Sequence, residues 1–149
     1  MEKIGDLVIF AMIQFVVTWM MVGIMWFSQI VHYPLYKKIR EGFIEYERSH
    51  IRLAAVLLGP MMLIEVITAI IMIGMAEEGL LTQLAGANLL LLAVLWIFTL
   101  LFQVNQHQKL SIHFSKNILR RLIYSNWIRT LLWTVKGGVM VAFVVELIA

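Results

Sequence analysis

The chain has 149 residues, of which 62% are hydrophobic and only 14% are charged. Soluble domains usually have an apolar share of about half, so this composition indicates an integral membrane protein. The sequence contains no cysteine, which excludes disulfides, thiolate metal sites and cysteine nucleophiles. The net charge of +3 does not imply a nucleic-acid partner, because anionic lipid headgroups account for a basic membrane face.

Four apolar runs follow one another along the chain, at about residues 7–31, 51–75, 84–106 and 126–148. Each is long enough to cross a bilayer core about 30 Å thick, which takes roughly 20 residues of helix. We therefore predict an all-α fold in which residues 1–149 form a single domain. That domain is an integral membrane four-helix transmembrane bundle with up-down-up-down topology.

The connections between these runs differ in length and charge. Residues 76–83 make a short turn, whereas residues 32–50 and 107–125 are longer, charged and partly amphipathic. The longer loops and their adjoining helix ends contain ten of the twelve Lys and Arg residues: Lys37, Lys38, Arg40, Arg48, Arg52, Lys109, Lys116, Arg120, Arg121 and Arg129. The positive-inside rule then predicts a multi-pass protein of the bacterial cytoplasmic (inner) membrane, with both long loops in the cytoplasm and both termini outside.

The second long loop has a helical pattern of its own. Leu110, Phe114, Ile118 and Leu122 recur every four residues, which predicts an amphipathic helix lying on the cytoplasmic membrane surface. We expect short interfacial helices of this kind in both long loops. Their basic side chains would contact anionic headgroups, so membrane lipids are the first predicted partners.

Histidines mark one end of the predicted bundle. His32 ends the first apolar run, His50 begins the second and His107 ends the third, so alternating helices place all three on the cytoplasmic side. Bundle proteins assemble metal and cofactor sites from side chains on facing helices. These three histidines are therefore the predicted metal ligands, whereas His113 lies in the amphipathic surface segment.

The residues alone leave the kind of site open. Neutral imidazoles together with Glu45 or Glu47 would suit zinc, copper or iron, and histidines from two helices would also suit a b-type haem. Histidines at helix ends also lie in the headgroup region, where they bond water or lipid phosphate. No two of the four histidines are three or four residues apart, so the Glu-x-x-His and His-Glu-x-x-His motifs are absent.

Further polar side chains extend this end of the bundle toward the middle of the bilayer. Gln29 and Gln103 share a helix side with His32 and His107, and Arg129 lies at the start of the fourth run. Such amide and guanidinium groups would orient the oxygen atoms of a ligand. The predicted ligand-binding residues are Gln29, His32, Tyr33, His50, Gln103, His107, Asn126 and Arg129.

One acidic residue, Glu65, lies deep in the second run, about 20 Å from His50 by helical rise. An unpaired charge at that depth costs about 2.5–3.5 kcal/mol on insertion scales. Lys136 of the fourth run lies within about one helical turn of the same depth. We therefore predict an intramembrane ion pair between Glu65 and Lys136, with either a functional or a purely structural role.

Three stretches carry a resemblance to known proteins: "QIVHYPLYKKI", "FIEYERSHIRLAAVLLGPMMLIE" and "NWIRTLLWT". Over nearly its whole length the chain resembles a family of largely uncharacterised bacterial four-helix integral membrane proteins with a His-Tyr-Pro-Leu corner and an Asn-Trp-x-Arg-Thr motif. It is more distantly similar to the anthrone oxygenase-like membrane family. The resemblance implies importance for His32, Tyr33, Pro34, His50, Arg52, Glu65, His107, Asn126, Arg129 and Thr130. The chain departs from the family where Asn105-Gln106-His107 replaces Pro-x-His at the exit of the third helix.

The leading functional prediction is a His-rich site inside the bundle, facing the cytoplasm. It would bind a metal, a haem or a lipophilic quinone-like or aromatic ligand, with a redox or proton-transfer role. The alternative is a non-catalytic subunit or scaffold in a larger membrane complex of respiratory or photosynthetic type, or a homo-oligomer. A small transporter ranks third, because few polar residues continue the path to the outer face.

Overall fold

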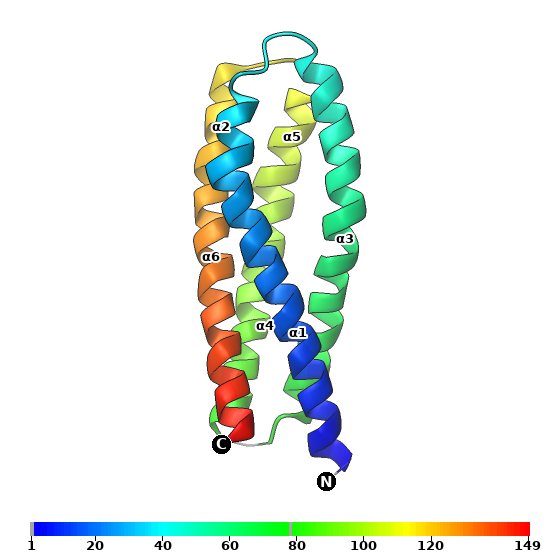
Figure 1. Cartoon of the computed structure of the whole chain (residues 1–149), viewed down its shortest axis with the longest axis vertical. Coiled ribbons are helices and arrows are strands. Elements are labelled where there is room, and N and C mark those ends of the chain that lie inside the picture. The colour runs from blue at the N-terminus through cyan, green and yellow to red at the C-terminus, as the bar shows by residue number, and fades with distance from the viewer. Residues whose placement is uncertain (1, 78) are drawn as a thin grey trace.

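Four long helical segments make up the protein, and each is long and apolar enough to cross a membrane (Figure 1). The computed structural model describes the backbone of residues 2–77 and 79–149 and the side chains of residues 4–77 and 79–149. In chain order the elements are α1 (Glu2–Phe27), η1 (Ser28–His32), α2 (Tyr33–Tyr36), α3 (Phe43–Met75), α4 (Leu80–Phe98), η2 (Thr99–Val104), α5 (Asn105–Leu110) and α6 (Lys116–Ile148). The predicted all-α fold with four apolar helices is confirmed.

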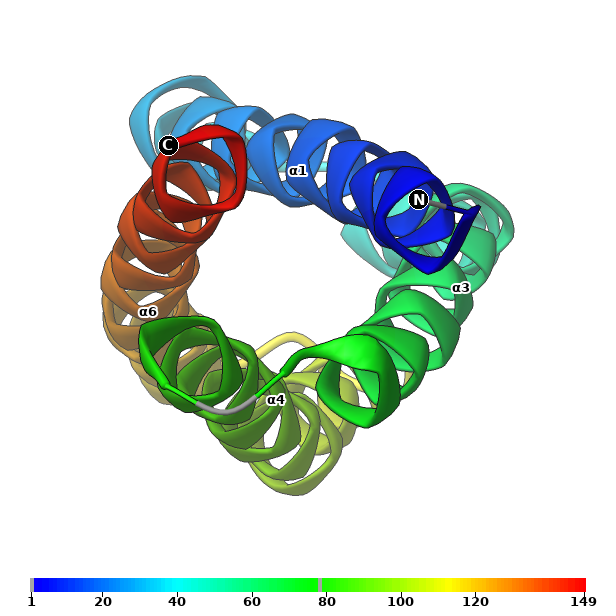
Figure 2. The same cartoon turned by 90° about the horizontal axis from the view of Figure 1, so that it is seen from below.

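The four segments alternate in direction around one axis. Both termini lie at one end of the molecule, and the turns of residues 37–42 and 111–115 lie at the other (Figure 1). Viewed along the axis, the order around the ring is α1, α3, α4 and α6 (Figure 2). Each long helix therefore packs against two neighbours, and both basic connections lie at the same end.

The helices extend well beyond the four apolar runs. α3 begins at Phe43 and α6 at Lys116, so the connections shrink to residues 37–42 and 111–115. Ser115 marks the start of α6, where its side chain accepts a hydrogen bond from the Ile118 N–H. The prediction of separate interfacial helices in the two long loops is wrong, because these segments continue directly into α3 and α6.

The amphipathic face of the second long loop has a different partner from the one expected. Leu110 and Leu122 are fully buried, in one cluster with Tyr33 and Tyr36 from the end of the first segment. Phe114, by contrast, is 44% exposed. The predicted continuous helix is wrong, because residues 111–115 form a turn between α5 and α6, and Leu110 and Leu122 pack against neighbouring helices.

The first segment continues past Pro34, contrary to the end predicted near residue 31. The backbone widens into the π-helical segment η1 just before the proline, and the Tyr33 N–H bonds the Ser28 carbonyl five residues earlier. A proline ring normally clashes with the carbonyl four residues back. The wider π-helical turn shifts that register and lets the helix continue. The chain finally reverses at Gly42, whose φ of +68° suits glycine.

The outside of the bundle is apolar and the inside contains polar groups. Leu53, Val56, Leu90 and Leu101 are between 62% and 72% exposed, which fits lipid contact. The buried polar side chains of the described residues are Gln14, Thr18, Gln29, Glu47, Glu65, Thr68, Asn88, Gln103, Asn126, Arg129, Thr130 and Lys136. An apolar outer surface around an interior that also contains polar groups is typical of membrane helices.

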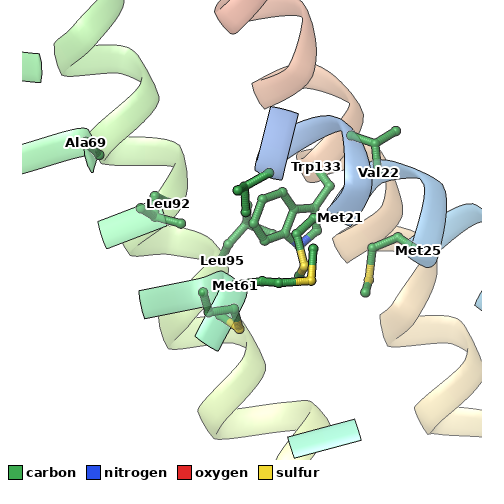
Figure 3. Packing of buried hydrophobic residues seen from close by; sticks show 10 residues of the cluster. Met21, Val22, Met25, Met61, Ala69, Leu92, Leu95 and Trp133 are labelled. Carbon is green, nitrogen blue, oxygen red and sulfur yellow. The ribbon is translucent and has the colours of Figure 1, made fainter. Parts of the chain in front are cut away.

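Methionines and a tryptophan fill the middle of the bundle (Figure 3). Trp133 of α6 is fully buried in one cluster with Met21 and Met25 of α1, Met61 of α3 and Leu95 of α4. Flexible thioether side chains fill irregular gaps between rigid groups. This core holds all four helices together, and Met25 also lines the cavity at the loop end.

Two adjacent glycines of α6 provide a matched test of how closely α1 and α6 approach. A Cβ on Gly137 would lie 3.3 Å from Trp19 Cζ2 and 3.4 Å from Val22 Cγ2, whereas a Cβ on Gly138 would meet nothing within 4 Å. We expect Gly137→Leu to destabilise the protein by about 1–3 kcal/mol through overpacking. Gly138→Leu should be near neutral when both variants are unfolded with SDS in mixed micelles, and equal stabilities would contradict the close approach.

Candidate functional site

A cavity of about 350 Å³ lies inside the loop end of the bundle. α3 forms one wall, and the third segment forms another along α4, η2 and α5, while α1, η1 and α6 close the inner side. The cavity exists because α3 and η2 do not pack closely, although α3 contacts both α4 and α5. Its volume lies in the range of small-molecule sites.

The cavity gathers most of the predicted site residues from all four long segments. Gln29 is the exception and lies just behind the wall, hydrogen-bonded to Asn126. The predicted residues that line the cavity are His32, Tyr33, His50, Gln103, His107, Asn126 and Arg129.

Three imidazole rings form a continuous row along one side of the cavity. The ring centroids of His32 and His50 are 4.7 Å apart with an interplanar angle of 22°, and those of His50 and His107 are 5.1 Å apart at 36°. His107 Nδ1 lies 2.6 Å from Glu47 Oε1, and Glu47 is fully buried. The row therefore begins at a carboxylate of α3. The fourth histidine, His113, is exposed and does not line the cavity.

The metal prediction for His32, His50 and His107 gains no support from this arrangement. Among the described residues, no group of three or more His, Asp or Glu side chains is placed to hold a metal ion. The rings lie beside one another, face to face or tilted, and His107 Nδ1 is already bonded to Glu47. Glu45, the other predicted acidic ligand, is exposed.

A second set of polar side chains, on α6 and η1, forms a chain of amide and guanidinium groups. Arg129 Nη1 donates a hydrogen bond to Asn126 Oδ1 at 3.3 Å, and Asn126 Nδ2 donates to Gln29 Oε1 at 2.8 Å. The Arg129 side chain is only 6% exposed. Asn126 thus orients the guanidinium group, which explains why an asparagine stands three residues before the arginine on one helix side.

Five side chains that line the cavity each have a buried polar atom with no hydrogen-bond partner in the described part of the chain. These atoms are His32 Nε2, Trp96 Nε1, Thr99 Oγ1, Gln103 Oε1 and Arg129 Nε. An unpartnered buried donor or acceptor costs about 1–3 kcal/mol, so buried polar groups are normally satisfied. They are five of the eleven such atoms among the described residues, and a ligand or ordered water in the cavity would supply their missing partners.

Apolar side chains form the inner part of the cavity wall, and some lining residues reach the outer surface of the bundle. Leu58 and Met62 of α3 and Met25 of α1 line its inner part. At the outer edge, the lining residues Leu100 and Val104 of η2 are 54% and 38% exposed. The site therefore combines polar side chains with apolar walls, and part of its lining reaches the outer surface of the bundle.

Two π-helical segments shape this site, and the sequence analysis missed both. η1 contains Gln29 and His32, and η2 contains Thr99 and Gln103. Single π-helical turns occur often at functional sites because they rotate the following side chains. Thr99 and Trp96 were also missed, although Thr99 lies four residues before Gln103 and eight before His107, a spacing that places all three on one helix side.

The predicted partners Glu65 and Lys136 are in contact, in a separate network toward the terminal end of the bundle. Lys136 Nζ forms an ion pair with Glu65 Oε2 and donates to Thr18 Oγ1 at 2.8 Å. Gln14 Nε2 and Thr18 Oγ1 donate to the Glu65 carboxylate at 2.6 and 2.7 Å. All four side chains are fully buried, and none of them lines the cavity.

No known protein family, curated protein or solved structure matches the chain. The resemblance to bacterial four-helix membrane proteins therefore stays a prediction, and the site has to be judged on its own geometry.

Proposed function

We propose that the protein is a multi-pass protein of the bacterial cytoplasmic membrane that binds a lipophilic, oxygen-bearing small molecule in the cavity at the loop end. The basic turns lie on the cytoplasmic side and both termini lie outside, as the positive-inside rule favours. The quinone-like and aromatic ligands predicted from the sequence belong to this class. The metal, haem and redox roles stay predictions.

One observation carries this proposal: five side chains with unpartnered polar atoms line a cavity whose deeper wall, at Met25, Leu58 and Met62, is apolar. Donors such as Trp96 Nε1 and Arg129 Nε would bond oxygen acceptors of the ligand. Leu58 and Met62 would accommodate its apolar part. A ligand reaching the site from the bilayer would need no aqueous path.

A matched pair of glycines on α3 tests the proposal. Gly59 lines the cavity and Gly74 does not, and a Cβ on either would meet nothing within 4 Å. The probe is a long-chain alcohol that carries a diazirine group, and the labelled residues are identified by peptide mass spectrometry. We expect saturable labelling of the cavity wall in the wild type and in Gly74→Phe. In Gly59→Phe, whose ring occupies the cavity, labelling should fall about tenfold or more.

The control is competition with an excess of the same alcohol without the diazirine group. If this competitor does not reduce the labelling, the probe has only partitioned into the micelle. That result, or equal labelling of Gly59→Phe and Gly74→Phe, would overturn the proposal. Thermal unfolding of both variants provides the control for folding, and we expect both to stay near the wild-type midpoint because neither site is crowded.

A further inference from the structure

Arg129 is a buried cation that has no carboxylate partner among the described residues. Its side chain is 6% exposed, and its hydrogen bond goes to Asn126, a neutral amide. Arg129 lies thirteen residues from the start of α6, about 20 Å from the basic turns by helical rise. Neither ion pair of the described residues includes Arg129.

The buried carboxylates of the described chain already have other partners. Glu47 contacts His107 at 2.6 Å, and Glu65 is in the ion pair with Lys136. Buried charges are normally paired because an uncompensated charge in a low-dielectric interior is strongly unfavourable. In the described part of the chain the guanidinium group therefore has no anionic partner, its Nε has no hydrogen-bond partner, and its side chain lines the cavity.

We infer that the ligand of this cavity is an amphiphilic anion whose negatively charged head contacts Arg129. This inference rests on the proposed function and adds the charge of the ligand. A carboxylate or phosphate head accepts hydrogen bonds from a guanidinium group in a planar, two-point geometry. Asn126 is a positioning residue, because its Oδ1 accepts a hydrogen bond from Nη1 of the Arg129 side chain, which lines the cavity.

The apolar walls select the rest of the molecule. Met25, Leu58 and Met62 would contact an aliphatic or aromatic body, whereas a small inorganic anion would leave these walls without contacts. The head has two possible sources, a free single-chain amphiphile or an anionic phospholipid from the bilayer, and both present the same chemistry to Arg129.

Three chain-matched probes test the inference: dodecanoate, dodecanol and dodecylammonium. Their dissociation constants are measured by equilibrium dialysis at about pH 8, where the carboxylate is ionised, against protein in nanodiscs of zwitterionic lipid. Because hydrogen bonds to charged groups are the stronger ones, we expect dodecanoate to bind the wild type about ten- to a hundredfold more tightly than dodecanol. Dodecylammonium should bind more weakly than dodecanol.

Arg129→Gln should abolish the preference for dodecanoate over dodecanol, whereas Arg129→Lys should retain part of it. Repeating the titration in nanodiscs with phosphatidylglycerol separates the two sources. If phosphatidylglycerol weakens dodecanoate binding to the wild type but not to Arg129→Gln, the bilayer is the source of the anion. If it does not weaken dodecanoate binding to the wild type, the anion is a free amphiphile.

The inference would be overturned if the wild type bound dodecanoate and dodecanol with equal affinity and Gly59→Phe bound neither. The proposed function would still stand in that case. If every probe bound the wild type and Gly59→Phe equally, both the inference and the proposed function would be overturned. The wild-type comparison needs no substitution at Arg129, so the test remains decisive even where Arg129→Gln does not fold.

Discussion

Lys136→Met is expected to destabilise the protein by about 3–5 kcal/mol, because it leaves the buried Glu65 carboxylate without its cation. The pair joins α3 to α6, and the donors Gln14 and Thr18 add α1 to the same network. All these groups are fully buried. No other cation of the described residues contacts the Glu65 carboxylate, which makes this the largest single effect we expect.

The measurement is SDS-induced unfolding in mixed micelles, followed by circular dichroism. Lys109→Met removes an exposed lysine and is the control, for which we expect a change below about 0.5 kcal/mol. The double variant Glu65→Gln/Lys136→Met should recover much of the loss, because it removes both charges at once. A loss below 1 kcal/mol in Lys136→Met would show that the pair is not a main support of the bundle.

His107→Leu is expected to cost about 2–3 kcal/mol, because it removes the partner of a second buried carboxylate. Glu47 is fully buried, and His107, whose side chain is 15% exposed, supplies its hydrogen bond across α3 and α5. Hydrogen bonds to charged groups are worth more than neutral ones. His113→Leu is the matched control, since that exposed histidine lies in the turn beyond α5 and should tolerate the change.

The double variant Glu47→Leu/His107→Leu separates a structural role of His107 from a role in the site. Stability should return toward the wild-type value because no charge is left unpaired. Probe binding should stay reduced if His107 also contacts the ligand from the cavity wall. Recovery of both stability and binding would assign His107 to support of the fold alone.

The fold was predictable because its information is local. Four apolar runs of membrane length, separated by charged segments, determine the number of helices and their alternation. The exact ends of the helices, and the packing of the loop segments, were not predictable in the same way. Leu110 and Leu122 have the periodicity of an amphipathic helix, and that pattern does not distinguish a lipid surface from the neighbouring Tyr33 and Tyr36, which are distant in sequence.

The candidate site was predictable in part. Matching depths on alternating helices brought His32, His50 and His107 to one level, and the structure places them in one row. Sequence spacing does not give the orientation of the imidazole rings. It therefore suggested a metal site, whereas the structure places the three rings beside one another. Trp96 and Thr99 were missed because a tryptophan and a threonine in an apolar helix carry no signal that separates a cavity wall from ordinary packing, although the spacing of Thr99 from Gln103 and His107 was available.

The central claim is that the cavity holds a lipophilic ligand, and native mass spectrometry of protein released from bacterial membranes tests it most directly. We predict one additional small-molecule mass on the wild type and on Gly74→Phe, and none on Gly59→Phe. A wild-type protein without such a mass, or an equal adduct on Gly59→Phe, would contradict this account.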